Sequence, residues 1–416
     1  MTEPAENKSA AVAFRTLGCK QNQFDARWLQ SQLPGDSFTV AADLHQADWI
    51  VLTCCAVTER ALAKARGELH RLKRSHPQAK VVVVGCGSRY QPDQFSAADF
   101  VDQLPQEFQI AGYSNGIGSN LHGSHGLVPQ GRSRAFLRIQ NGCDQFCAFC
   151  IVPHLRGKSS SVPEAELQQS LQELVKAGVA EVVLTGTNIA LWGRDLNPQA
   201  DLLDLLKSLS KDLKYTRLRL SSLEPQFTPL ELISWCTEQE NICNHFHVAV
   251  QSGSDRILNK MGRGGLNKQF FTALSKIKKA RPGLSLGADI LVGFPSESEN
   301  DFQATIKLLE EVPFNYLHVF PYSERQGTPA ASFPDSISKT ERLARAANLR
   351  KLDSELRLNF INSNIGRSAD VITLSEKAQT KIQGLTSNYL RVQLQPGQIS
   401  SNRRFTTKLS KTSFNL

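Results

Sequence analysis

Short apolar segments alternate with helical patterns along most of this chain of 416 residues, and no other feature constrains the fold as strongly. In residues 11–110, three apolar and partly β-branched segments end in polar turns, and each is followed by a helical pattern. The predicted strands are Ala11–Leu17, Asp48–Thr53 and Lys80–Gly85. Strand–helix alternation implies a parallel sheet with helices on its faces. We therefore predict an N-terminal α/β domain over residues 11–110.

A second series of strand and helix patterns runs from residue 135 to about residue 320. The predicted strands are Ala135–Gln140, Glu181–Thr185, Tyr215–Ser221, His245–Gln251, Ser285–Val292 and Asn315–Phe320. The predicted helices between them are Glu164–Ala177, Leu202–Leu213, Lys268–Ala280 and Glu299–Glu311. A closed barrel of eight β–α units typically needs about 250 residues. This segment is shorter, so we expect either a doubly wound sheet or a partial barrel of six units.

Three further segments complete the predicted domain organisation. Residues 111–134 are rich in glycine and serine and are predicted to be a linker. A capping-box pattern from Ser338 to Glu341 opens a helix, which extends the second domain from residue 135 to residue 363. Residues 364–416 lack a helical pattern, and the last fifteen or so residues do not resemble a closing strand. Strand-like pieces in this tail are Ala369–Leu374, Lys381–Ile382 and Tyr389–Leu394.

The tail also carries most of the excess positive charge of the chain. From Gly366 onward it holds eight Lys or Arg against two Asp or Glu, whereas the whole chain holds 48 against 39. Small basic β-barrels often bind nucleic acid. We therefore predict a small basic β-domain over residues 364–416, with a merely solvated basic end as the alternative.

Composition excludes several classes of protein. The hydrophobic fraction of 40% is ordinary for a globular chain. The longest aliphatic run is Val81–Val84, far short of the about 20 apolar residues of a membrane span. The first ten residues lack the apolar core of a secretory signal. We expect a cytoplasmic protein with no membrane partner, in which the nine cysteines are core thiols or metal ligands and form no disulfides.

Three of the cysteines, Cys143, Cys147 and Cys150, stand at spacings of four and three just after a predicted strand. The loop after a strand is where α/β folds hold ligands. A structural zinc site needs four ligands, and the nearby sequence offers no fourth cysteine or histidine at a suitable spacing. Thiolates are typical ligands of iron–sulfur clusters. Three thiolates would leave one iron of a [4Fe–4S] cluster open for a ligand that takes part in chemistry.

A second trio is dispersed along the N-terminal domain. Cys19, Cys55 and Cys86 each follow one of its three predicted strands. Because parallel strands share one carboxyl edge, the three thiols should converge there and form a second cluster site. Small buried cysteines at strand ends are also common, so core thiols remain the alternative. Side-chain alternation would send either Cys54 or Cys55 away from the site. Cys236 and Cys243, in a predicted helix and turn, are expected to be structural thiols.

Around these cysteines the chain resembles the radical S-adenosylmethionine methylthiotransferases over roughly residues 12 to 395. The loop Cys143–Cys150 is similar to their CxxxCxxC motif, and Cys55 takes the place of the ligand in their N-T-C-A-V-T motif. The other matching segments are Thr16–Asp25, Gly85–Cys86, Ile151–Pro153, Arg156–Gly157, Gln251–Asp255, Val292–Pro295, His318–Ser323 and Gly327–Pro329. The opening motif and Arg219–Pro225 resemble most the branch that acts on threonylcarbamoyladenosine in tRNA.

The resemblance implies a partial (β/α)6 radical SAM barrel and a small C-terminal β-barrel that binds RNA. It implies two [4Fe–4S] clusters, one on Cys143, Cys147 and Cys150 and one on Cys19, Cys55 and Cys86, together with S-adenosylmethionine. The implied reaction adds a methylthio group to C2 of N6-threonylcarbamoyladenosine at position 37 of tRNA. The partners implied are the tRNA anticodon stem-loop, an electron donor such as flavodoxin or ferredoxin, and a sulfur donor.

Further site residues are predicted from their positions at strand ends. Gly186 is a candidate for close approach of the cofactor, and Ser222 and Gln251 are candidate polar contacts. No residue is predicted to act as an acid–base catalyst. Basic residues of the tail are candidates for phosphate contacts, namely Arg391, Arg403, Arg404 and Lys408. The alternatives are the same chemistry on isopentenyladenosine or a ribosomal protein, a non-catalytic iron–sulfur protein, and a zinc-dependent RNA-binding protein.

The sequence departs from the family pattern in four places. Thr53 replaces a common asparagine, Gly87-Ser88 replaces a bulky residue and alanine, and Ser296 replaces a glycine. The segment Lys158–Ser161 replaces an arginine-rich run.

Overall fold

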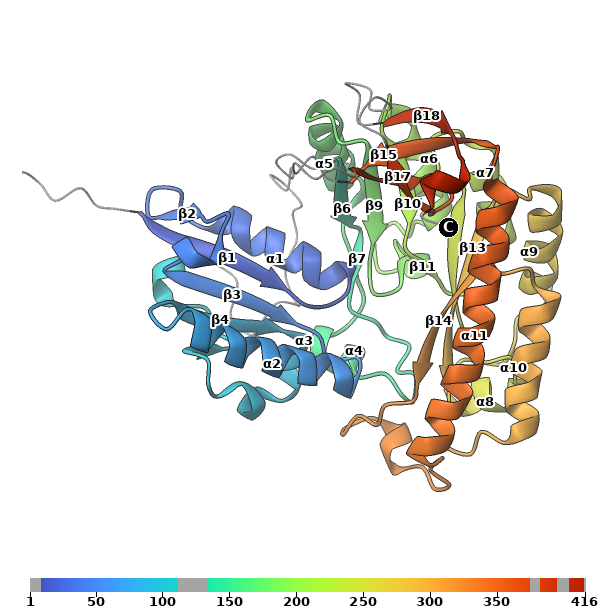
Figure 1. Ribbon diagram of the computed structural model, residues 1–416, viewed down its shortest axis with the longest axis horizontal. Coiled ribbons are helices and arrows are strands. Elements are labelled where there is room, and N and C mark those ends of the chain that lie inside the picture. The colour runs from blue at the N-terminus through green and yellow to red at the C-terminus, as the bar shows by residue number, and fades with distance from the viewer. Residues whose placement is uncertain (1–8, 111–132, 375–381, 395–403, 415–416) are drawn as a thin grey trace, which may run out of the picture. The chain divides into compact units, whose positions relative to one another are not determined.

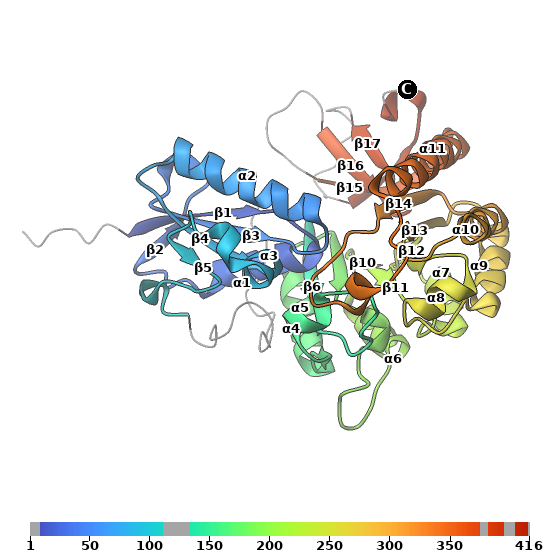
Figure 2. The ribbon, with the colours of Figure 1, turned by 90° about the horizontal axis from the view of Figure 1, so that it is seen from below.

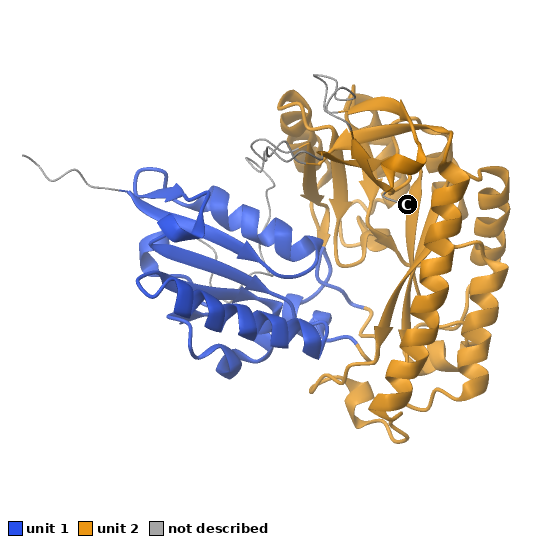
Figure 3. Cartoon of the chain, viewed as in Figure 1, with its two compact units in different colours: residues 1–127, 141–144, 150–160 blue, residues 128–140, 145–149, 161–416 orange. Residues whose placement is uncertain are grey.

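The computed structural model describes residues 9–110, 133–374, 382–394 and 404–414. The chain divides into two compact units (Figure 3). The first unit comprises residues 1–127, 141–144 and 150–160, and the second comprises the remaining residues up to Leu416. The predicted linker 111–134 lies almost wholly outside the described residues, so the domain boundaries built on it stay predictions.

The first unit contains a five-stranded parallel sheet with strand order β2-β1-β3-β4-β5. Its strands are β1 (Ala10–Thr16), β2 (Phe38–Val40), β3 (Trp49–Cys54), β4 (Lys80–Gly85) and β5 (Phe100–Val101). Its helices are α1 (Lys20–Gln32), α2 (Glu59–Ser75), α3 (Cys86–Tyr90) and α4 (Val152–Arg156). Helices α1 and α2 lie on opposite faces of the sheet (Figures 1 and 2). The predicted parallel α/β sheet is confirmed, and the short edge strands β2 and β5 were not predicted.

The second unit contains a partial barrel of parallel strands, as the resemblance implied. Its two sheets have the strand orders β10-β9-β6 and β11-β12-β13-β14, and a bridge joins Leu218 to Ile242 between them. The strands are β6 (Arg134–Arg138), β9 (Glu181–Thr185), β10 (Arg217–Leu220), β11 (Ser222–Leu223), β12 (His245–Gln251), β13 (Ser285–Val292) and β14 (Tyr316–Pro321). The doubly wound alternative is therefore wrong, because the strands form two curved sheets and not one open sheet.

Helices cover the outer face of this barrel (Figure 1). They are α5 (Glu164–Lys176), α6 (Leu202–Leu209), α7 (Leu230–Glu238), α8 (Asp255–Lys260), α9 (Lys268–Ala280), α10 (Glu299–Glu311) and α11 (Lys339–Asn364). Ser338 accepts a hydrogen bond from the Glu341 amide at 3.1 Å and so caps α11 as predicted. Alternation along the strands sends apolar residues such as Phe246 and Val248 toward the helices. The other face, which we call the inner wall, carries polar residues including His247.

The C-terminal segment forms a four-stranded antiparallel sheet of order β17-β16-β15-β18. Its strands are β15 (Ser368–Thr373), β16 (Ile382–Thr386), β17 (Arg391–Leu394) and β18 (Arg404–Lys408). The expectation of no closing strand in the last fifteen or so residues is wrong, because β18 pairs with β15. Strand β18 lies at the sheet edge, where charged residues are favoured because they discourage pairing with other chains. That composition hid the strand from hydrophobic pattern analysis.

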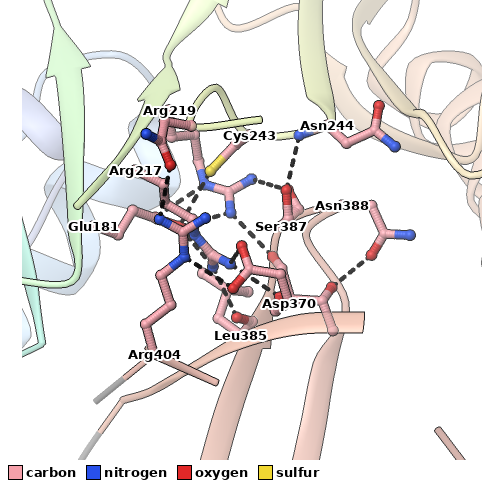
Figure 4. Close-up of polar contacts among 12 residues, drawn as sticks. Glu181, Arg217, Arg219, Cys243, Asn244, Asp370, Leu385, Ser387, Asn388 and Arg404 are labelled. Atoms are coloured by element: carbon pink, nitrogen blue, oxygen red, sulfur yellow. Dashed lines mark hydrogen bonds and ion pairs between the residues drawn. The ribbon is translucent and has the colours of Figure 1, made fainter. Parts of the chain in front are cut away.

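A buried ion network joins this sheet to the first strands of the barrel (Figure 4). The Glu181 carboxylate lies at the start of β9 and accepts from Arg217 Nε at 2.9 Å and from Arg219 Nη2 at 2.7 Å. The same two guanidinium groups donate to the backbone carbonyls of Leu385, Thr386 and Ser387. Burial alone would raise the pKa of Glu181, but the surrounding arginines hold it well below its usual value.

Replacing Glu181 with glutamine should strongly destabilise the second unit. Among the described residues, Glu181 is the carboxylate that pairs with the fully buried Arg219, whereas Arg217 would keep its pair with Asp370 at 2.8 Å. Removing the partner of such a buried charge typically costs about 3–5 kcal/mol. Urea unfolding followed by circular dichroism measures the decrease in the free energy of unfolding. The matched control is Glu231→Gln on α7, where the carboxylate is exposed and the expected change is within about 0.5 kcal/mol. Equal stability of the two variants would contradict the structural role of the network.

Candidate metal centre

The carboxyl edge of the first sheet brings together three cysteines from separate parts of the chain. Cys19 precedes α1, Cys55 directly follows β3, and Cys86 begins α3. Burial, together with the nearby Cys19 and Cys86 thiols, raises the pKa of the Cys55 thiol to about 12. The three cysteines therefore lie at the same edge of the sheet, each just past the end of a parallel strand. Their ligation of a metal centre stays a prediction.

Cys54 points away from this group, into the core between the sheet and α2. Its Sγ accepts a hydrogen bond from the Ser88 amide at 3.2 Å. A Cβ atom added at Gly87 would lie only 2.7 Å from Cys54 Sγ. The departure from the family pattern at Gly87-Ser88 therefore has a local cause, because a bulky residue at position 87 would clash with the Cys54 side chain.

Asn22 fixes the loop that carries Cys19. Its amide donates to the backbone carbonyl of Cys54 at 2.7 Å, and its Oδ1 accepts from Cys19 Sγ at 3.3 Å. Asn22 is fully buried, so these bonds tie the end of β1 to the end of β3. Gly85 has φ of 112°, and a Cβ atom there would lie 2.7 Å from the Cys54 carbonyl oxygen. The close approach of two strand ends thus requires glycine at this position.

A buried arginine supplies positive charge beside these thiols. Arg156, at the end of α4, places Nε 3.3 Å from Cys86 Sγ and Nη2 2.6 Å from an Asp25 oxygen. Its Nη1 donates to Asn141 Oδ1 at 3.1 Å. Burial raises the pKa of Cys86, and the Arg156 charge opposes that rise. The pattern analysis quoted Arg156 as a family match without giving it a role, and the structure places it against a candidate ligand.

The loop with Cys143, Cys147 and Cys150 lies between β7 (Gln140–Asn141) and α4, and β8 (Ser160–Ser161) follows α4. Cys143 is buried, and the other two cysteines are half-buried. Within the first unit, the Cys143 amide donates to the Gly157 carbonyl at 3.0 Å. Within the second unit, the backbone of Ala148 bonds to Met261 at 2.9 Å and to Ala330 at 2.8 Å. Each part of the loop is therefore anchored in its own unit.

Arg263 and Glu224 form a second charged pair near Cys147, and sequence reasoning assigned no role to either. Arg263 Nη1 lies 3.8 Å from Cys147 Sγ, and its Nη2 binds Glu224 and donates to the Ala249 carbonyl at 2.7 Å. Burial raises the pKa of Cys147, and the Arg263 charge opposes that rise. Glu224 lies inside the quoted Arg219–Pro225 motif, which is the one sequence signal that marks this pair.

Of the predicted cofactor contacts, Gly186 and Gln251 lie at the carboxyl ends of barrel strands, and Ser222 begins the short strand β11 just past the end of β10. Gly186 follows β9, and a Cβ atom there would lie 3.0 Å from Gln140 Oε1 and 2.8 Å from an Ile189 methyl group. Packing therefore accounts for the glycine at this position. Ser222 is exposed on β11, and Gln251 is half-buried at the end of β12 with φ of 65°. Contact of these three residues with a cofactor stays a prediction. Cys236 and Cys243 are buried in the barrel unit.

Comparison with known proteins first defines the class. Residues 137–309 match the family model described as "Radical SAM superfamily", and residues 11–104 match the model described as "Uncharacterized protein family UPF0004". A solved structure of the radical S-adenosylmethionine methyltransferase TsrM from Kitasatospora setae, with cobalamin and a [4Fe–4S] cluster bound, has a TM-score of 0.55 at 14% identity. The match covers 78% of this chain and 77% of that one, and it supports the fold alone.

Whole-chain relatives then define the family. The threonylcarbamoyladenosine tRNA methylthiotransferase MtaB of Aquifex aeolicus is 32% identical over 92% of this chain and 96% of its own length. The protein of the same name from Bacillus subtilis is 33% identical over 92% and 90%. The tRNA-2-methylthio-N(6)-dimethylallyladenosine synthase of Natranaerobius thermophilus is 31% identical over 82% and 80%. The chain belongs to the tRNA methylthiotransferase family of radical SAM enzymes, whose members use S-adenosylmethionine and [4Fe–4S] clusters.

None of the helices in the described residues has the length and apolar character needed to span a membrane.

Removing the Arg156 charge should destabilise the first unit. Arg156→Gln removes one half of the ion pair between Arg156 and the fully buried Asp25, which typically costs about 3–5 kcal/mol. Adding Asp25→Asn removes the other charge of the pair, so the double variant should recover most of the loss. Urea unfolding measures both effects.

The control for this pair is Arg66→Gln on α2, which breaks a largely exposed ion pair with Glu59 and should cost at most about 1 kcal/mol. An equally small cost for Arg156→Gln, or no recovery in the double variant, would show that the buried pair is not what stabilises this site.

Proposed function

We propose that this protein adds a methylthio group to C2 of N6-threonylcarbamoyladenosine at position 37 of tRNA. The presence of two separate cysteine trios carries the proposal. One trio lies at the carboxyl edge of the first sheet, and the other lies in the loop that leads into α4. Two relatives named for this substrate are each more than 30% identical to the chain, and the motifs Thr16–Asp25 and Arg219–Pro225 support the choice of nucleoside.

The two trios would each hold one [4Fe–4S] cluster. Cys143, Cys147 and Cys150 would hold the cluster that binds S-adenosylmethionine, and Cys19, Cys55 and Cys86 would hold the second. The donor chemistry fits, because each trio consists of thiols with an arginine beside one member. When bound, these groups supply the one-electron chemistry that acid–base residues cannot perform on an adenine C–H bond.

The residues of the chain would prepare these sites. Arg156 and Arg263 would offset the negative charge of the Cys86 and Cys147 thiolates, so that less repulsion opposes deprotonation of neighbouring ligands. Gly186, Ser222 and Gln251 would contact S-adenosylmethionine at the carboxyl ends of the barrel strands. An electron donor such as flavodoxin or ferredoxin, and a sulfur donor, would complete the reaction in the cytoplasm.

The basic tail would bind phosphates of the anticodon stem-loop. Arg391 and Lys408 are exposed on the C-terminal sheet and are the best candidates. Arg404 is engaged within the protein, because its Nε pairs with Asp370 at 3.0 Å and its Nη1 donates to the Tyr215 carbonyl at 2.8 Å. We therefore assign Arg404 to the sheet and not to the nucleic acid. Arg403 lies outside the described residues.

A second candidate substrate is an adenosine with an isoprenoid N6 substituent. The relative from Natranaerobius thermophilus, named for dimethylallyladenosine, is 31% identical over 363 residues. That identity is close to those of the threonylcarbamoyladenosine relatives, so the choice between the two rests on the quoted motifs. Both substrates involve the same reaction at C2.

Iron content should distinguish Cys55 from its neighbour Cys54. Anaerobically reconstituted wild-type protein should contain about eight iron and eight sulfide per chain, as expected for two [4Fe–4S] clusters. Cys55→Ala and Cys147→Ala should each retain about half, since each removes one ligand of a different cluster. Cys54→Ala should keep the full content, because the Cys54 side chain points into the core.

Cys147→Ala should in addition lose reductive cleavage of S-adenosylmethionine, whereas Cys55→Ala should keep it. Loss of iron in Cys54→Ala but not in Cys55→Ala would overturn the ligand assignment. Zinc in place of iron in the wild type would instead favour a zinc-dependent RNA-binding protein.

The substrate is tested in a strain that lacks this gene. Nucleoside mass spectrometry of its tRNA should find no 2-methylthio-N6-threonylcarbamoyladenosine. The precursor without the methylthio group, N6-threonylcarbamoyladenosine, should accumulate. Loss of the methylthio form of isopentenyladenosine alone would refute the proposed substrate and favour the second candidate. Complementation with the Cys54→Ala variant should restore the modification, and complementation with Cys55→Ala should not.

A further inference from the structure

The inner wall of the barrel holds a cluster of three potential metal ligands that neither cysteine trio includes. His247 lies on β12, Asp289 on β13 and His318 on β14. One nitrogen from each histidine and one oxygen of Asp289 all lie within 4.8 Å of one another. The three residues come from adjacent strands, and Asp289 and His318 are direct partners in the strand register.

Strand alternation explains why these polar residues meet. Their neighbours along the chain, such as Val248, Ala288 and Leu317, are buried in the core beneath the helices. The three ligand candidates therefore share the opposite face. His247 is buried, Asp289 is half-buried, and the side chain of His318 is 46% exposed. The cluster thus has a rigid inner side and one side that remains open to a ligand.

The distances fit a single metal ion. His247 Nε2 lies 2.8 Å from Asp289 Oδ1, and His318 Nδ1 lies 3.2 Å from the same oxygen. Two ligand atoms that each lie about 2.0–2.2 Å from one metal are separated by about 3.0–3.5 Å when they are adjacent in its coordination shell. Both pairs are within a few tenths of an ångström of that range.

A hydrogen bond on the other side of the imidazole ring already orients His247. Its other ring nitrogen, Nδ1, lies 2.9 Å from the Tyr316 hydroxyl, which in turn lies 2.7 Å from His245 Nε2. A histidine that binds metal through one nitrogen almost always hydrogen-bonds through the other, and that bond fixes its tautomer and orientation. The two contacts that link His245, Tyr316 and His247 provide this support.

The charge of Asp289 also calls for a cation. Within the described part of the chain, its ion-pair partners are the two histidines, and no lysine or arginine pairs with it. A half-buried carboxylate is costly unless a cation or a metal balances it. A proton on one imidazole or a bound divalent ion would balance this charge, and the divalent ion would in addition use both imidazoles as ligands.

We propose that His247, Asp289 and His318 form a binding site for a divalent transition metal, of the zinc or ferrous class, on the inner wall of the barrel. Two imidazoles and one carboxylate are a common ligand set for these ions. Three protein ligands leave at least one coordination position open. The exposed side of His318 directs that position into the barrel interior, where a water molecule or an oxygen atom of a bound ligand would fill it.

The test uses anaerobic protein with its iron–sulfur clusters in place, and zinc as the probe. After incubation with Zn²⁺ and desalting, wild type should retain about one zinc per chain. Zinc-edge X-ray absorption should show only nitrogen and oxygen ligands at about 2.0–2.2 Å. Failure to retain zinc, or sulfur ligands at about 2.3 Å, would overturn the proposal, and neither outcome depends on methylthiotransferase activity.

Matched variants locate the site. His318→Ala removes a largely exposed ligand and should weaken zinc binding at least tenfold, about the scale of losing ligand support. Tyr316→Phe keeps all three ligands but removes the hydroxyl at His247, and should weaken binding about 10–100-fold. His70→Ala, at an exposed histidine on α2, should bind zinc as wild type does. If His318→Ala bound zinc with the affinity of the wild type, the metal site would be refuted. The three residues would then be only a cluster of histidine and aspartate side chains that share protons.

Discussion

Parallel strands deliver the residues that follow them to one edge of a sheet, and this constraint organises the first unit. Cys19, Cys55 and Cys86 are far apart in sequence, yet each stands just past a strand that runs in the same direction. The fold therefore gathers three thiols without any local motif. The loop Cys143–Cys150 achieves the same grouping by spacing alone. Two different routes thus produce the two sets of candidate ligands.

Sequence reasoning located the elements that have a strong periodic pattern. The bounds of β4, β9, β12 and β13 agree with the predicted strands. Strands β4 and β9 are buried apolar runs, and β12 and β13 alternate apolar residues with polar or small ones. The short strands β2 and β11 were missed, because a segment of two or three residues is too short to show a periodic hydrophobic pattern. At the site, alternation along β3 correctly separated Cys54 from Cys55. The partners Arg156 and Asp25 could not be paired in advance, because 131 residues separate them.

Two departures from the family pattern have physical explanations in the structure. Cys54 and Gly87 occupy one small space, so the side chain at either position limits the size of the other. Ser296, at the position of a family glycine, has φ of 68°, in a region that residues other than glycine rarely adopt. Hydrogen bonds from its amide to Asp335 and to its carbonyl from Arg256 hold that conformation.

The ion network around Glu181 has a consequence for how the chain can be divided. The guanidinium groups of Arg217 and Arg219 are capped by carbonyls of residues 385–387, which belong to the C-terminal sheet. Truncation after α11 would remove the acceptors of five of the eight hydrogen bonds that these two guanidinium groups make, since Asp370 would be lost as well. The described strands of the tail are therefore tied to the barrel by buried polar contacts, and a barrel expressed without the tail should be unstable.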